Sequence, residues 1–66
     1  MNIIVNGAQQ DCPTKANITQ LLELLDLQDK RVALEINKEV VPKGEYDSYI
    51  LNDGDNIEII QAIGGG

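Results

Sequence analysis

The sequence predicts a two-layer α+β fold, in which a mixed sheet of four to five strands is covered on one face by one helix. Three observations support this class. Residues 3–5 are β-branched, residues 18–25 have the period of an amphipathic helix, and residues 56–63 have the composition of a strand. A chain of 66 residues builds at most one such domain.

The first two strands are expected to form a hairpin. Residues 3–5 lead directly into Asn6-Gly7, a dipeptide that accepts positive φ at both central positions of a type I′ turn. The returning strand, residues 8–12, is mostly polar and is closed by Pro13. We therefore expect it at an edge of the sheet.

A helix is expected next, because apolar residues recur at spacings of three and four. They are Ile18, Leu21, Leu22 and Leu25. Asn17 is a suitable N-cap, and Gln20 three residues later completes a capping box. The period is lost around Asp26, so we expect the helix to end there and Leu27 to fold back onto the core.

The second half of the chain begins with another predicted hairpin. Residues 32–36 alternate in polarity with the two-residue period of a half-buried strand. Asn37-Lys38 is a plausible tight turn, and residues 39–41 form a short returning strand that Pro42 stops.

The last strand is predicted after a loop. Residues 43–49 are polar and irregular, so we expect a loop with one helical turn. The segment 52–55, Asn-Asp-Gly-Asp, is a strong turn signal. Residues 56–63 form the most strand-like run of the chain and are expected at the centre of the sheet. This order of elements is that of the β-grasp, or ubiquitin-like, architecture.

Two parts of the chain are expected: a β-grasp domain, residues 1–63, and a flexible glycine tail, residues 64–66. No basic segment followed by an apolar core marks a secretory signal, and no apolar run approaches the length of a membrane span. We therefore expect a cytoplasmic protein without membrane contacts.

The composition excludes several classes of function. The chain has no histidine and one cysteine, so it cannot by itself build a Cys/His zinc site, a Ser-His-Asp triad or an internal disulfide. With 5 Lys plus Arg against 11 Asp plus Glu, the net charge is −6, which argues against nucleic-acid binding and favours a partner with a basic docking surface. We expect no enzymatic activity, no metal and no bound cofactor.

The most informative motif is the end of the chain, Gly64-Gly65-Gly66. A segment without side chains can enter a narrow channel in another protein and present its carboxylate there. Because a carboxylate is a poor acyl donor, we expect a partner enzyme to adenylate it with ATP before a sulfur or nitrogen nucleophile attacks. The alternative is a disordered tail or an expression remnant.

Two other motifs have structural interpretations. Cys12 has no Lys, Arg or His beside it in the sequence that would lower the pKa of its thiol, so we interpret it as a small packing residue and not as a sulfur relay. The sequence Asp53-Gly54-Asp55 lacks the further acidic positions of an EF-hand loop and is interpreted as a turn.

Several of these segments together resemble the ThiS family, the sulfur carriers of thiazole formation in thiamine biosynthesis. The segments are the first hairpin with Asn6, the run Ile-Asn-Lys-Glu-Val-Val-Pro at 36–42, Asp53-Gly54-Asp55, and Gly65-Gly66 at the end. The resemblance covers essentially the whole chain and implies the strand order 2-1-5-3-4. One departure is Tyr46, where members of the family often have tryptophan.

The resemblance also implies roles and partners. The carboxyl group of Gly66 would be adenylated by a ubiquitin-activating-type (ThiF-like) adenylyltransferase that uses ATP, and would become a thiocarboxylate with sulfur from a sulfur donor protein. Gly65 and Gly64 would thread into the partner, although the family does not fix the residue at position 64. The sulfur would then pass to a ThiG-like thiazole synthase.

Three alternatives remain open at this point. The small subunit of molybdopterin synthase uses the same thiocarboxylate chemistry, but it is usually longer and has a phenylalanine-rich start, whereas this chain has no phenylalanine. A ubiquitin-like protein modifier and a plain interaction domain are the others. If partners dock through apolar contacts, we expect Ile59 or Val40 on an exposed face of the sheet.

Overall fold

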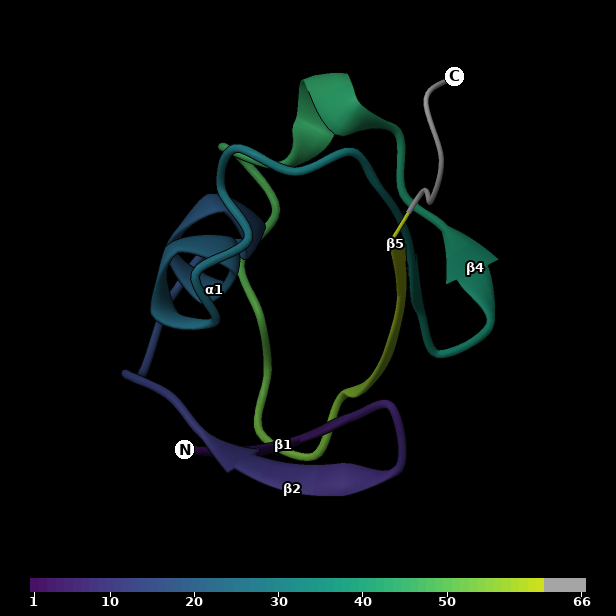
Figure 1. Ribbon diagram of the computed structural model, residues 1–66. Coiled ribbons are helices and arrows are strands. Elements are labelled where there is room, and N and C mark those ends of the chain that lie inside the picture. The colour runs from purple at the N-terminus through teal and green to yellow at the C-terminus, as the bar shows by residue number, and fades with distance from the viewer. Residues whose placement is uncertain (62–66) are drawn as a thin grey trace.

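A five-stranded sheet and one α-helix form the two layers of the computed structural model, which describes residues 1–61. The sheet order is β2-β1-β5-β3-β4, as the resemblance implied, and β5 (Asn56–Gln61) lies at its centre. It is parallel to β1 (Asn2–Val5), and the other strand pairs are antiparallel (Figure 1). This confirms the mixed β-grasp sheet. The predicted domain end at residue 63 and the glycine tail lie outside the described residues.

The first hairpin has the predicted turn. β1 returns as β2 (Ala8–Asp11), and the two turn residues, Asn6 and Gly7, have φ values of 51° and 83°. Positive φ at both central positions defines a type I′ turn. β2 lies at one edge of the sheet, as its polar sequence predicted.

The second hairpin is built in the same way. β3 (Val32–Ile36) returns as β4 (Glu39–Val40), with φ values of 52° at Asn37 and 72° at Lys38. β4 lies at the other edge of the sheet. The loop that follows contains one helical turn, the 3-10 helix η1 (Lys43–Glu45), as predicted.

The helix α1 (Ile18–Leu24) begins with the predicted capping box. The Asn17 side-chain oxygen accepts a hydrogen bond of 2.7 Å from the backbone N–H of Gln20, and the Gln20 side-chain oxygen accepts one of 2.8 Å from the backbone N–H of Asn17. Two N–H groups at the helix start thereby gain partners.

The helix ends at Leu24, two residues before the predicted end, because the chain turns into a left-handed cap. Asp26 has a φ of 61°, and its N–H donates to the Glu23 carbonyl at 3.0 Å. The N–H of Leu27 donates to the Leu22 carbonyl at 2.7 Å. These bonds form a Schellman motif, which turns Leu27 back against the core as expected.

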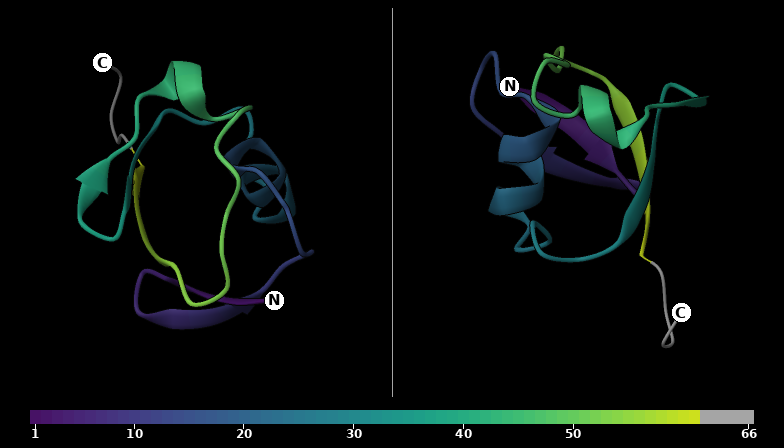
Figure 2. Two further views of the ribbon diagram at one scale, coloured as in Figure 1. Left: turned by 180° about the vertical axis from the view of Figure 1, so that it is seen from behind. Right: turned by 90° about the horizontal axis from the view of Figure 1, so that it is seen from above.

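α1 covers one face of the sheet, and the core lies between the two layers (Figure 2). Six large apolar side chains are fully buried: Ile3, Ile18, Leu21, Leu34, Leu51 and Ile57. Tyr46 also packs in this core with 7% of its surface exposed. Within residues 1–61, no helix is long and apolar enough to cross a membrane.

The two faces of β5 correct one expectation. Ile57 and Ile59 face the helix and are buried, whereas Ile60 is 61% exposed on the opposite face. The expectation that Ile59 is exposed was therefore wrong, and the one for Val40, which is 72% exposed, is confirmed. The sequence misled because Ile59 and Ile60 are both apolar, so alternation alone does not assign their faces.

Candidate functional site

The candidate site is the end of β5, from which the chain continues to the predicted reacting group. Gly64, Gly65 and Gly66 themselves lie outside the described residues. The last residue of β5, Gln61, pairs with Val32, the first residue of β3. The surface around this pair is therefore where a partner would meet the base of the predicted tail.

On the β1 side of β5, the side chain of Asn6 continues the hydrogen bonding of the strand pair. The backbone pairing of β1 with β5 runs through Val5 and Ile57, and the chain then turns at Asn6. The Asn6 Oδ1 atom accepts a hydrogen bond of 2.8 Å from the N–H of Ile59, and its Nδ2 donates one of 3.1 Å to the carbonyl of Ile59. The Asn6 amide thus forms the two bonds that a further strand residue would form.

This clamp by Asn6 lies two residues before the end of β5, so it holds the strand close to the base of the predicted tail. The sequence identified Asn6 as a turn residue only. Its hydrogen bonds to Ile59 could not be predicted from neighbouring residues, because Ile59 is 53 residues away along the chain.

The start of β5 is held by a buried carboxylate, Asp55, which the sequence interpretation treated only as part of a turn. Asp55 has 7% of its surface exposed, and its oxygens accept hydrogen bonds of 2.8 Å from the N–H of Asn52 and 3.1 Å from the side chain of Asn37. The Asn37 side-chain oxygen in turn accepts one of 3.0 Å from the N–H of Asn56. This network joins the β3–β4 turn to the start of β5 and satisfies the buried charge.

The interpretation of the 53–55 segment as a turn is confirmed by a φ of 84° at Gly54 and by a hydrogen bond of 3.1 Å from the N–H of Asp55 to the carbonyl of Asn52. Within residues 1–61, no group of three or more Cys, Asp and Glu side chains is arranged to hold a metal ion.

The sheet face opposite α1 combines exposed apolar side chains with acidic ones. In the β3–β5 pairing, Glu35 lies directly opposite Glu58, and like charges in such positions destabilise a sheet. We call this surface the outer sheet face and define it by Ile4, Glu35, Val40, Glu58 and Ile60. It is open to a partner that supplies apolar and cationic groups.

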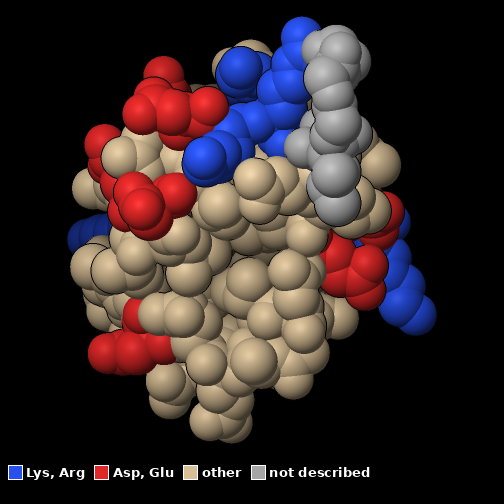
Figure 3. Space-filling view, viewed as in Figure 1, with Lys and Arg blue, Asp and Glu red and all other residues tan. Residues whose placement is uncertain are grey.

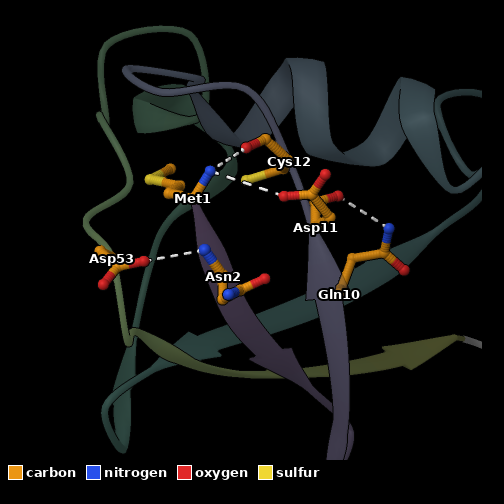
Figure 4. A network of polar contacts seen from close by, with 6 residues as sticks. All are labelled: Met1, Asn2, Gln10, Asp11, Cys12 and Asp53. Atoms are coloured by element: carbon orange, nitrogen blue, oxygen red, sulfur yellow. Dashed lines mark hydrogen bonds and ion pairs between the residues drawn. The ribbon is translucent and has the colours of Figure 1, made fainter.

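Cys12 lies at the end of the sheet opposite to Gln61, close to Met1. Figure 4 shows the polar contacts around it. It follows β2, and its N–H donates to the carbonyl of Met1 at 2.9 Å, whereas Gln61, the last described residue, lies at the far end of β5, the strand parallel to β1. Its carbonyl oxygen accepts a hydrogen bond of 2.7 Å from the N-terminal ammonium, which lies 3.6 Å from Asp11.

The Cys12 side chain is 4% exposed, and burial raises the pKa of its thiol above the usual 9.0 even though the N-terminal ammonium opposes this shift. The thiol is therefore protonated near neutral pH. This confirms the interpretation of Cys12 as a packing residue.

The chain matches the family model described as "ThiS family" over residues 3–66. It is 36% identical to the sulfur carrier protein ThiS of Escherichia coli, and the match covers 100% of both chains. In fold it is similar to the crystal structure of a thiamine biosynthesis protein (ThiS) from Geobacter metallireducens, with a TM-score of 0.84, 35% identity and full coverage of both chains.

A different kind of relative is a thiazole synthase of Paramagnetospirillum magneticum, which is 38% identical to the chain over 66 residues. All of this chain is matched, but it spans only 20% of that protein. A second thiazole synthase, from Magnetococcus marinus, is 36% identical with the same coverage. A segment similar to this chain is thus part of each of these longer proteins.

The Asn6 clamp predicts that Asn6→Gly lowers the free energy of unfolding by about 1–3 kcal/mol. Glycine keeps the positive φ, but the N–H and the carbonyl of Ile59 lose their hydrogen bonds to the Asn6 side chain. Urea denaturation measures the change. The matched control is Lys38→Gly, which also places glycine at a positive φ in a type I′ turn but removes no side-chain hydrogen bond found among residues 1–61. Equal stability of the two variants would contradict the clamp.

The burial of a thiol and two phenol groups predicts that the folded state loses stability at alkaline pH. Burial raises the pKa of Cys12, Tyr46 and Tyr49 above their usual values of 9.0, 10.0 and 10.0, with Asp55 and Glu39 adding to the shift of Tyr49. The folded state thus favours the neutral groups, and the stability this contributes is present below the usual pKa values and is lost as the pH rises above them.

Denaturation at a series of pH values should therefore show a free energy of unfolding that decreases from about pH 9 upward. Cys12→Ala should flatten the part of the profile between the thiol and phenol ranges. An unchanged slope there would mean that Cys12 is not shielded from solvent in the folded protein.

Proposed function

Because the chain belongs to the ThiS family, we propose that it is a sulfur carrier of thiamine biosynthesis and that the carboxyl group of Gly66 carries the sulfur. The family match runs to Gly66 itself, and the match to the Escherichia coli carrier covers both chains completely. In this proposal the protein is not an enzyme. It is the substrate of one partner and the sulfur donor of another.

The chemistry takes place on the main chain. A carboxylate oxygen of Gly66 attacks the α-phosphorus of ATP, and pyrophosphate leaves, which produces an acyl adenylate. Hydrosulfide-level sulfur from a donor protein then attacks the carbonyl carbon, AMP leaves with the former carboxylate oxygen, and a thiocarboxylate and a proton remain. An adenylyltransferase of the ThiF type would supply the ATP site for the first step and hold the acyl adenylate until sulfur displaces AMP.

The observation that carries the proposal is the position of β5. This central strand is paired on both sides and ends at Gln61, and five residues follow it. Five residues span at most about 17 Å, which is enough for the Gly66 carboxyl group to enter a partner's active site while the folded domain stays outside. The three glycines present no side chain to such a channel.

The thiazole synthase relatives support the second partner. In these proteins a segment similar to the whole of this chain makes up a fifth of the polypeptide. We therefore propose a ThiG-like thiazole synthase as the acceptor of the sulfur.

The outer sheet face is the proposed docking surface for the adenylyltransferase. It includes Ile60, the residue before Gln61, so a partner that takes the tail from this end also reaches the face. The opposed carboxylates of Glu35 and Glu58 lower the stability of the free sheet, and a cationic group on the partner would relieve their repulsion.

Removal of Gly66 should abolish sulfur loading without affecting the fold, because the buried apolar core extends only from Ile3 to Ile59 among the described residues. Intact mass is measured after incubation with ATP, the sulfur donor and the adenylyltransferase. The full chain should gain the mass difference between sulfur and oxygen, and the shortened chain should not. If the shortened chain also melted many degrees lower, the tail would be part of the folded domain.

A mass that corresponds to attachment to a lysine would instead support the modifier alternative. An unchanged full chain, under conditions in which the Escherichia coli relative reacts, would overturn the proposed function.

Glu58→Gln should raise the free energy of unfolding by about 0.2–1 kcal/mol, because it removes one of two like charges that face each other on the sheet. The same variant should need a higher concentration for half-maximal adenylation. Glu23→Gln, which changes an exposed glutamate on α1, is the control and should leave this concentration unchanged. A variant that is both more stable and adenylated as readily would show that Glu58 has no part in docking.

A further inference from the structure

A pocket of about 480 Å³ opens near the end of β5, on the helix side of the sheet. Val32, which lines it, pairs with Gln61 across the β3–β5 ladder, so the pocket lies beside the point where the described chain ends. We call it the basic pocket, and its lining includes Leu22, Lys30, Arg31, Val32, Lys43 and Tyr46.

The pocket has an apolar base and a cationic rim. Leu22 and Tyr46 are buried, with 6% and 7% of their surface exposed, and they come from α1 and from the segment after η1. The three cations of the rim, Lys30, Arg31 and Lys43, are exposed. A pocket of this kind suits a ligand that combines apolar and anionic groups.

The charge of the pocket is opposite to that of the chain. It contains three of the five Lys and Arg residues, and Asp47 is the one acidic residue among those that line it. The Asp47 carboxylate accepts a hydrogen bond from the Thr19 hydroxyl. The lining therefore has a charge of +2, whereas the whole chain has −6.

Figure 3 shows the same separation on the surface, where Lys and Arg atoms gather at the top of the view and acidic atoms lie around them. Within residues 1–61, Lys30 and Lys43 form no ion pair that would neutralise their ammonium groups. Both side chains are thus free to meet an anionic group from outside this part of the chain.

We propose that the basic pocket binds an acidic segment of the adenylyltransferase, at the mouth of the channel that receives the tail. This inference rests on the proposed function, because it requires a partner that encloses Gly66. An apolar side chain of that segment packs on Leu22 and Tyr46, and flanking carboxylates meet the ammonium groups of Lys30 and Lys43. The docking charges are therefore of both signs, with a cationic partner surface on the outer sheet face and an acidic one at the basic pocket.

The position of the pocket favours a protein segment over the phosphates of the nucleotide. In the adenylation step the phosphates lie at Gly66, five residues beyond Gln61. When those five residues are extended through a channel, they separate the phosphates from the base of the tail by up to about 17 Å. The rim cations remain at the mouth, where they face the protein surface around the channel.

The test uses two double variants of equal composition and charge. Lys30→Glu/Lys43→Glu, the rim variant, reverses the two lysines of the rim, and Lys15→Glu/Lys38→Glu reverses the two lysines that do not line the pocket. Lys38 lies in the β3–β4 turn, at the end of β3 opposite to Val32. All four lysines are exposed, so both variants should fold, which their melting temperatures check.

Adenylation is measured as a function of carrier and of ATP concentration. The rim variant should need about a tenfold higher carrier concentration for half-maximal rate, with the maximal rate and the half-saturating ATP concentration within about twofold of the original chain. Its dependence on salt should also be weaker, because fewer ionic contacts remain to be screened. The control variant should be shifted much less.

Carbodiimide coupling, which joins amines to carboxylates, gives a second readout with the original chain. Lys30 or Lys43 should become linked to Asp or Glu residues of the adenylyltransferase, and Lys38 should not, as peptide mass spectrometry would show.

Three results would overturn the inference. If both double variants raised the carrier concentration for half-maximal adenylation equally, only the total charge of the chain would matter for docking. If the rim variant left this concentration unchanged, the pocket would have no part in docking. A higher ATP requirement would assign the cations to the nucleotide. If the original chain itself gains no sulfur, the proposed function fails instead, and the two failures are thereby distinguished.

Discussion

The hydrogen bonds that hold β5 between β1 and β3 are the constraint on which the other features of the molecule depend. β3 pairs with β5 from Val32 to Ile36, but the backbone pairing of β1 covers only the register pairs of Ile4 and Val5. The side chain of Asn6 extends this short ladder, and Asp55 secures the start of the strand. The register of this pairing directs Ile57 and Ile59 into the core. It also places Gln61 opposite Val32, at the margin of the sheet.

In the proposed function, this arrangement would let a domain without histidine and with a protonated, buried thiol take part in acyl chemistry. The folded domain would position the end of β5, and the proposed reacting group, the Gly66 carboxyl group, belongs to the main chain. In the proposed function, partners therefore dock on the surface around the end of β5, where the outer sheet face and the basic pocket lie on opposite sides of the sheet. The two surfaces differ in charge, so together they define one orientation of a partner.

Local features were predicted well from the sequence. The first type I′ turn and the capping box depend on residues within a few positions of one another, so Asn6-Gly7 and the Asn17 and Gln20 pair identified them directly. Asn37-Lys38 was predicted as a tight turn, and the structure gave its type. The end of α1 was placed two residues late, because a left-handed residue at the cap is usually glycine and here it is Asp26. The face of Ile59 was wrong because its neighbour Ile60 is equally apolar, and pairing with β3 decided between them.

By itself, the sequence determined the order of elements, the absence of histidine and the glycine run that we propose carries the reacting carboxyl group, because these depend on residue identity and short-range spacing. The tertiary structure decided what distant residues do together. It joined the Asn6 amide to Ile59, buried the Asp55 carboxylate in a network with Asn37, and brought Lys43 to the same pocket as Lys30 and Arg31. Such contacts require the sheet register, which only the packing of β5 against both neighbours and the helix sets.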